Sequence, residues 1–523
     1  MSRFLFLFIY ISNIFAISSF EPSHTITSDL RFSNLYQDGM VLQREPYNAT
    51  LWGYGIIPNE TKADIKCSLN DKLLNPSSRF TQIDDKIWIM DVQAMKGGTS
   101  CNISIPVGNE SLTLTKVLFG DLWFCGGQSN MVFGMNSVYN ATQEMEEAKK
   151  YKQIRFTRVV RESSEAVDDQ MDINLVHDWV DPSSSNLGEM SAVCFLYAKY
   201  IYDQIKIPLG LIDSCVGGTK IESWSNQKML DSCEIEHEQL DCKSPDFINC
   251  NTRLYNKMVH PLTRTTLKGF LWYQGESNTA WNENKYNCSF PTLINGWRQE
   301  FSSNSNTNKS APFGFVQLST IKYGNMGLGM SKIRWHQTAD RAIVPNSVLQ
   351  NVFMAIAIDT YDEPNGIHPR YKQIVGQRLT IAGMNVAYGN SSFPTNGPHP
   401  SDLNLGQGPT ISLEYNQKIR YNQTEISGFY YCCLDDFDQC DHFARNWVEI
   451  EKENVEVNKD NATFDTINIY VGKIPACQRQ DYYRVPHLAY LWRETPIKGY
   501  LAAPIYGMDK FNLPAAPWKV VVL

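Results

Sequence analysis

Four short stretches of this sequence carry residues of the types that cleave esters. They contain Ser129 in CGGQSNM, Gly218 in CVGGTK, Asn278 in YQGESN and His368 in GIHPRYK. A serine that hydrolyses an ester needs a base to activate its hydroxyl, a proton carrier for the leaving alcohol, and hydrogen-bond donors aimed at the developing oxyanion. A serine, a histidine, a glycine N–H and an asparagine amide together satisfy these needs. The four residues are therefore our candidates for a catalytic set.

Each stretch taken alone also has a structural explanation. A Gly-Gly pair after a strand is a common tight turn, an asparagine at a strand end is a common cap, and a histidine before proline is often structural. The combination, in the order Ser, Gly, Asn, His along the chain, favours catalysis. We expect Ser129 to be the nucleophile and His368 its base, with the oxyanion held by the N–H groups of Ser129 and Gly218 and by the Asn278 amide.

The four stretches follow apolar segments that we expect to be strands of one sheet. The segments VLFGDLWFC, LGLIDSC, KGFLWYQ, FGFVQLS and NVFMAIAID alternate with helix-like stretches between residues 116 and 390. Strands that are apolar on both faces are typical of a parallel sheet covered by helices on both sides. Ligands of such sheets bind beyond the carboxyl ends of the strands. The sequence predicts an α/β domain over 116–390 with its site at that edge.

Different patterns flank this region. Residues 19–115 contain short alternating segments, such as KIWIMDVQ and SLTLTKV, that are separated by clusters of Asn, Gly, Pro and Ser. This pattern is typical of β-structure, and it returns over 391–523. We therefore expect an N-terminal and a C-terminal β-rich domain on either side of the α/β domain.

The first residues indicate export. Arg3 precedes the apolar segment from Phe4 to Phe15, and Ala16-Ile-Ser18 is a small-x-small pattern, so we expect a secretory signal peptide over 1–18. No later segment offers about 20 uncharged apolar residues, and no membrane span is expected. The mature protein is expected in the secretory pathway, in lysosomes or outside the cell. N-linked glycans are expected at the acceptor sequons, which include those at Asn48, Asn102, Asn140, Asn287, Asn308, Asn422 and Asn461.

Charge and cysteine usage exclude two kinds of partner. The formal net charge is −8 and there is no run rich in Lys and Arg, which argues against nucleic acid as a partner. The 13 cysteines include no C-x2-C pair, so a metal site is not expected. Some cysteines should form disulfides in an oxidising compartment. Cys125, Cys194 and Cys215 lie inside apolar runs, and we predict that they are buried free thiols.

The four blocks resemble those of the SGNH (GDSL-like) hydrolases, in which Ser is the nucleophile, Gly and Asn help to form the oxyanion hole, and His is the base. LFGDLWFCGGQSNM, IPLGLIDSCVGGTKIESWS, LKGFLWYQGESN, IRWHQTAD and IHPRYK are similar to the sialate O-acetylesterase family. The resemblance covers nearly the whole chain. It implies a three-layer parallel-sheet fold and a serine esterase that removes O-acetyl groups from sialic acids through an acyl-enzyme, without a metal or organic cofactor.

One position departs from this pattern. Many SGNH enzymes carry an aspartate three residues before the histidine, where this chain has Asn365. A carboxylate normally holds the imidazole in its useful tautomer and stabilises the imidazolium. Asp359, Asp362 and Glu363 lie in the same loop, and we weakly prefer the first two as the third member. A backbone carbonyl is another alternative, so the third member stays open.

Further polar residues are candidates for substrate binding. Gln128, Gln274 and Glu276 flank the proposed centre and would either bind sugar hydroxyls or hydrogen-bond the backbone at strand ends. Arg334 would hold a sugar carboxylate, since Arg suits bidentate recognition. The expected substrate is a small or glycan-linked O-acetylated sugar. Esters of carbohydrates other than sialic acid, and a sugar-binding glycoprotein without catalysis, remain alternatives because a fold does not fix a function.

Overall fold

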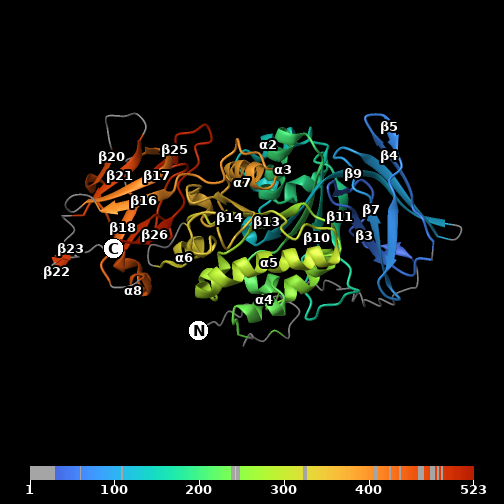
Figure 1. Cartoon of the computed structure of the whole chain (residues 1–523), viewed down its shortest axis with the longest axis horizontal. Coiled ribbons are helices and arrows are strands. Elements are labelled where there is room, and N and C mark those ends of the chain that lie inside the picture. The colour runs from blue at the N-terminus through green and yellow to red at the C-terminus, as the bar shows by residue number, and fades with distance from the viewer. Residues whose placement is uncertain are drawn as a thin grey trace, which may run out of the picture.

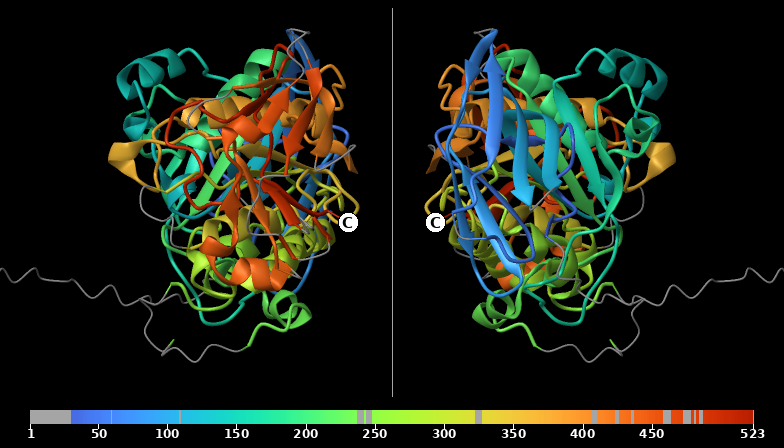
Figure 2. Two further views of the ribbon diagram at one scale, coloured as in Figure 1. Left: turned by 90° about the vertical axis from the view of Figure 1, so that its left-hand side faces the viewer. Right: turned by 90° about the vertical axis from the view of Figure 1, so that its right-hand side faces the viewer.

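The computed structural model describes residues 30–522 apart from 59, 108–109, 237–241, 243–247, 322–326, 406–409, 423–425, 435–436, 458–463, 472–477, 480–481 and 484–486. The predicted signal peptide lies outside the described residues. Figure 1 shows three regions along the long axis: β-structure in blue at the N-terminal side, a central α/β region, and β-structure in orange and red at the C-terminal side. The end-on views in Figure 2 place the two β-rich regions at opposite ends.

A mostly parallel sheet forms the centre, as the alternating segments predict. All neighbouring strands run parallel except the edge strand β11. Every residue of β12, β13, β14 and β15 is buried, which explains their continuous apolar sequences. The spatial order is β11 (Leu175–Val180), β10 (Ile154–Val159), β12 (Leu209–Cys215), β9 (Glu110–Gly127), β13 (Gly269–Tyr273), β14 (Phe313–Gln317) and β15 (Val352–Ile356).

Helices cover both faces of this sheet and complete a three-layer arrangement. Helices α3 (Ala192–Ile205) and α7 (Lys372–Val386) lie on one face, and α4 (Gln227–Ser232) and α5 (Tyr286–Asn304) lie on the other (Figure 1). Helix α3 begins at a Ser191 cap whose side chain accepts the N–H of Cys194, a strongly preferred N-terminal signal. No helix in the described part of the chain is long and apolar enough to cross a membrane.

The register places three strand ends together at the carboxyl edge. Gly127, the last residue of β9, pairs with Cys215 of β12 on one side and with Tyr273 of β13 on the other. Gly127 has a φ of 137°, and a Cβ there would lie 2.3 Å from the Tyr273 carbonyl oxygen, so only glycine fits. The loops that follow these strands carry the residues singled out in the sequence.

Strand β9 also continues into the N-terminal β-structure. Its first part pairs with β8 (Ser100–Val107) and its last part pairs with β12 and β13. The expected boundary between residues 115 and 116 therefore falls inside one uninterrupted strand. The N-terminal region adds a further sheet of β1 (Arg31–Phe32), β3 (Ala49–Tyr54), β7 (Ile87–Val92) and β6 (Ser78–Gln82).

The C-terminal region is built from two larger sheets, as the return of the β pattern predicts. One contains β16 (Pro400–Leu405), β17 (Thr410–Tyr421), β21 (Phe464–Tyr470), β20 (Val455–Val457) and β25 (Ile505–Gly507). The other contains β19 (Val448–Glu449), β18 (Phe429–Cys432), β24 (His487–Tyr490) and β26 (Trp518–Val521). This region returns to the central one, because the Leu501 N–H donates to the Asp359 carbonyl at 2.8 Å.

The cysteines correct one prediction. Cys125 and Cys194 form a disulfide with a Cα–Cα distance of 6.1 Å, so the expectation of free thiols is wrong for both. Strand β9 and helix α3 pack against each other, and the sequence does not show this proximity between residues 69 positions apart. Cys215 is free and buried, as predicted. The other disulfides that join two described residues are Cys67–Cys101, Cys233–Cys288, Cys242–Cys250 and Cys432–Cys440.

Candidate active site

The structure brings Ser129 and His368 into contact. Ser129 begins α1 (Ser129–Val132) directly after the turn that ends β9, and His368 lies in the loop between β15 and α7. The Ser129 Oγ and the His368 Nε2 are 2.8 Å apart, a hydrogen bond of the length expected between a nucleophile and its base. Both side chains are partly exposed, so the pair is open to a ligand.

The surroundings of His368 favour its neutral form. Burial of the imidazole lowers the pKa of His368 below its usual value, and the positive charge of Lys372 lowers it further. A neutral imidazole at neutral pH has a lone pair that accepts the serine proton. The histidine is therefore in the protonation state that a general base requires.

The loop after β12 lies next to Ser129. Gly217 lies against Ser129, because a Cβ on Gly217 would stand 3.6 Å from the Ser129 Cβ. Gly218 has a φ of 72° and open space where a Cβ would be. No acceptor among the described residues takes the N–H of Ser129 or of Gly218. Unused backbone N–H groups of this kind are what an oxyanion hole requires.

Asn278 does not offer a free donor beside the N–H groups of Ser129 and Gly218. It is fully buried, and its amide nitrogen donates to Glu222 Oε2 at 3.0 Å and to the Trp281 carbonyl at 3.1 Å. Its Oδ1 accepts from the Ile221 N–H at 2.9 Å. Both amide hydrogens are used, which contradicts the expectation that Asn278 donates to the oxyanion. Asn278 instead fastens the turn after β13 to the loop after β12.

Neither expected aspartate supports the histidine. Asp359 is fully buried, where it makes two hydrogen bonds with Arg378 at 2.5 and 2.8 Å and accepts the Tyr506 hydroxyl at 2.6 Å. Asp362 accepts from Arg370 at 2.8 and 3.0 Å. Arginine forms strong bidentate pairs with carboxylates, and these pairs hold both aspartates away from the imidazole.

The His368 Nδ1 therefore has no carboxylate partner within the described part of the chain. Glu363, the remaining alternative, is exposed. Asp362 shapes the histidine loop indirectly, because it also accepts from the Asn365 amide at 2.9 Å. The side chain of the residue that replaces the usual aspartate thus binds Asp362 and not the His368 imidazole.

The two glutamines have structural partners. Gln128 is buried, and its Oε1 accepts the N–H groups of Gly275 and Ser277 at 3.4 and 3.2 Å. Gln274 is fully buried and donates to the Thr219 carbonyl at 3.1 Å and to Asn278 Oδ1 at 2.7 Å. These contacts match the structural alternative, in which the two glutamines hydrogen-bond the backbone at strand ends.

Arg334 and Glu276 are also directed inward. Arg334 is fully buried, and its guanidinium donates to the carbonyls of Leu318, Ser319, Arg493 and Glu494. It joins the central region to the C-terminal region, so the expectation that it binds a sugar carboxylate is contradicted. Glu276 is buried and accepts the Asn130 amide at 2.6 Å, which does not leave it facing a sugar.

The sequence interpretation missed three residues at this edge. Asn130 and Lys372 belong to the quoted stretches QSNM and HPRYK, and the Lys372 Nζ donates to the Asn130 Oδ1 at 2.5 Å. Arg161 follows the end of β10, is exposed, and donates from its Nε to the Cys215 carbonyl at 3.1 Å. The segment that forms β10 (Ile154–Val159) was not among the predicted strands, so no prediction from the sequence pointed to Arg161.

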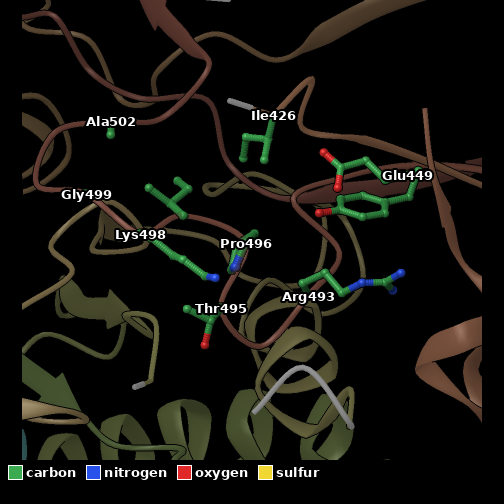
Figure 3. Close-up of a pocket in the computed structure, with 10 residues that line it drawn as sticks. Ile426, Glu449, Arg493, Thr495, Pro496, Lys498, Gly499 and Ala502 are labelled. Carbon is green, nitrogen blue, oxygen red and sulfur yellow. The ribbon is translucent and has the colours of Figure 1, made fainter. Parts of the chain in front are cut away.

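A separate cavity of about 520 Å³ lies in the C-terminal region (Figure 3). Its lining includes Tyr430, Glu449, Arg493 and Lys498. The Arg493 guanidinium already donates to the Ala444 carbonyl at 2.9 Å, and none of the lining residues belongs to the candidate site. No group of three or more His, Cys, Asp or Glu side chains is arranged to hold a metal ion in the part of the chain that the structure describes.

Comparisons with known proteins agree with this fold. The sequence profile described as "carbohydrate esterase, sialic acid-specific acetylesterase" matches residues 119–381, and that of the "sialate O-acetylesterase C-terminal domain" matches residues 405–522. A carbohydrate acetylesterase of known structure from Xanthomonas citri superposes with a TM-score of 0.72 at 24% identity. That match covers 94% of this chain and 99% of the other, and it supports the fold.

Two curated relatives are named sialate O-acetylesterase. The mouse protein is 36% identical over 451 residues, which are 78% of this chain and 82% of the relative. The human protein is 33% identical over 506 residues, which are 93% and 92% of the two chains. The chain is therefore a carboxylic ester hydrolase. It belongs to the sialate O-acetylesterase family.

The aspartate contacts make a prediction about catalysis. Asp362→Asn should lower kcat by less than about tenfold, because the carboxylate does not contact the imidazole. Removal of a true triad aspartate costs about 10⁴ in kcat. Steady-state hydrolysis of 4-nitrophenyl acetate measures the difference, with circular dichroism as the folding control. A loss near 10⁴ in a folded Asp362→Asn variant would show that Asp362 acts as the third member after all.

Proposed function

We propose that this chain removes O-acetyl groups from sialic acids through an acetyl-enzyme on Ser129. The contact between the Ser129 Oγ and the His368 Nε2 at 2.8 Å carries the proposal. The family of the chain and the names of its mouse and human relatives support the substrate class. Because no carboxylate contacts the His368 imidazole among the described residues, the proposed machinery is a pair rather than a triad.

The proposed reaction has two halves. In the first, the Ser129 Oγ attacks the acetyl carbonyl carbon while His368 Nε2 takes the hydroxyl proton, and the N–H groups of Ser129 and Gly218 bind the oxyanion. The bond to the sugar oxygen then breaks, and His368 gives the proton to the departing hydroxyl. In the second half, His368 takes a proton from water, the hydroxide adds to the acetyl carbon, and acetate leaves as the proton returns to Ser129.

Arg161 is our proposed partner for the sialic acid carboxylate. Its Nε holds the Cys215 carbonyl at 3.1 Å, and that carbonyl lies just before the Gly217-Gly218 loop against Ser129. The outer nitrogens of the guanidinium have no partner among the described residues. An exposed arginine with these donors free suits a planar carboxylate. It also lies at the sheet edge where ligands of this fold class bind.

The expected location remains a proposal as well. We propose that the protein works in the secretory pathway, in lysosomes or outside the cell. Disulfides persist in oxidising compartments, and those of this chain, such as Cys67–Cys101, support the proposal.

Replacement of the nucleophile tests the reaction. Ser129→Ala should lower acetate release from a 9-O-acetylated sialoside by at least about 10³-fold with folding intact. An acetylated neutral sugar and 4-nitrophenyl acetate are measured alongside. A folded Ser129→Ala variant that keeps more than about a tenth of the activity would contradict the role of Ser129. Wild-type activity on the neutral sugar alone would remove sialic acid as the substrate, and no activity on any ester would favour a sugar-binding protein.

Replacement of the arginine tests the substrate. Arg161→Met removes a charge-assisted contact of about 1.5–3 kcal/mol, so kcat/KM for the sialoside should fall about 10- to 100-fold. Hydrolysis of 4-nitrophenyl acetate, which has no carboxylate, should stay near the wild-type value. Arg79→Met on β6 is the matched control, because Arg79 is exposed in the N-terminal region. An equal loss on both esters would mean that Arg161 supports the loop and does not read the carboxylate.

A further inference from the structure

Next to Ser129 in the chain, the side chain of Asn130 makes three hydrogen bonds. Its Nδ2 donates to Glu276 Oε1 at 2.6 Å and to the Ile367 carbonyl at 3.0 Å. Its Oδ1 accepts from Lys372 Nζ at 2.5 Å. Lysine only donates, so the amide orientation is determined by its partners. Asn130 is buried, and these bonds use both ends of its amide.

The chain positions of these partners matter for the reacting groups. Asn130 directly follows Ser129, and Ile367 directly precedes His368. The hydrogen bond between them therefore ties the nucleophile segment to the histidine loop. Lys372 begins helix α7, which follows that loop, and it donates to the same amide. A shift of the Asn130 amide would move the loop that carries the imidazole.

Lys372 is fully buried without a direct carboxylate contact among the described residues. Its Nζ lies over the rings of Phe133 and Tyr273, at 5.0 and 5.1 Å from their centroids, where cation–π attraction compensates part of the lost hydration. Burial lowers the pKa of Lys372 to about 7, opposed by the charges of Glu276 and Asp362. Lys372 is therefore close to half protonated at neutral pH.

Glu276 completes the chain of contacts from the other side. One carboxyl oxygen accepts the Asn130 amide, and the other, Oε2, is buried without a hydrogen-bond partner within the described residues. Burial raises the pKa of Glu276, against the hydrogen bond from Asn130 and the charge of Lys372. A buried group with an unused oxygen is costly, and such groups often persist at functional sites.

We propose that Lys372, Asn130 and Glu276 form a buried positioning cluster that holds the Ser129 hydroxyl and the His368 imidazole in contact. Asn130 lies in α1, the helix after β9, and Glu276 lies in the turn after β13. Lys372 begins α7, the helix after the histidine loop. They are positioning residues, because they act through Ser129 and His368 and do not touch the substrate. The inference rests on the proposed function, since it assigns the cluster to the same reaction.

The cluster has an electrostatic signature that a purely structural role lacks. The charge of Lys372 disfavours protonated His368, so the base stays neutral to a lower pH. Removal of that charge raises the pKa of His368 toward its usual value of about 6.5. The acid limb of the kcat/KM profile should then move to higher pH. Among the described residues, the other charged groups that face Lys372 are Glu276 and Asp362, and both remain in a Lys372 variant.

The test is a pH profile of 4-nitrophenyl acetate hydrolysis by Lys372→Met. We expect kcat at pH 7.5 to fall about tenfold or more, since small misplacements of reacting groups reduce rates strongly, with KM within about twofold. We also expect the acid limb of the kcat/KM profile to move to higher pH. Lys372→Arg keeps the charge but displaces Asn130, so it should lose kcat without the upward shift. It also keeps the test decisive if the methionine variant fails to fold.

Lys199→Met is the matched control. Lys199 is buried in helix α3, where it pairs with Glu144 at 2.8 Å, and its loss should leave both kcat and the acid limb unchanged. A folded Lys372→Met variant with wild-type kcat and an unmoved limb would overturn the proposal, as would an equal limb shift in Lys199→Met. Ser129→Ala, run in the same assay, separates the two ideas: its residual activity tests the reaction itself, whereas the Lys372 variants test only the positioning cluster.

Discussion

The hydrogen bond between the Ser129 hydroxyl and the His368 imidazole joins residues 239 positions apart. It exists only because β9 and β15 run in the same direction, so that their carboxyl ends reach the same edge of the sheet. The two strands are not neighbours, since β13 and β14 lie between them. The register of each parallel pair must therefore be correct, because a slip in any of them would move the histidine loop away from the serine.

Buried amides then fix the loops beyond the strand ends. Gln128 holds the turn after β13, Gln274 holds the loop after β12, and Asn278 connects the two. A buried amide that lost one of these partners would be left unsatisfied at a cost of about 1–3 kcal/mol. This penalty makes the loop positions well determined. The framework leaves the N–H groups of Ser129 and Gly218 without acceptors in the described chain, and these are the donors that the proposed reaction assigns to the oxyanion.

The sequence predicts the central fold because its signals are local. Strands that are apolar throughout, helices between them, and polar residues at strand ends all follow from short segments. These signals placed Ser129, Gly218 and His368 at one edge. They do not distinguish an exposed polar side chain from a buried one, because Asn278, Gln274 and Arg334 acquire their partners from segments far along the chain. The same limit applies to Cys125 and Cys194, whose apolar surroundings suggested burial but not pairing. The sequence also does not show which side chains occupy the two aspartates. Arg378 binds Asp359 from the following helix, and Arg370 binds Asp362 from the following loop.

Covalent labelling of the serine is the most direct measurement of the central claim. The protein is treated with a fluorophosphonate at pH 7.5, and the modified peptide is identified by mass spectrometry. If His368 activates Ser129, the adduct lies on Ser129 and forms far more slowly in the His368→Ala variant. An unlabelled Ser129 in the folded protein, or labelling at the same rate without His368, would contradict the account.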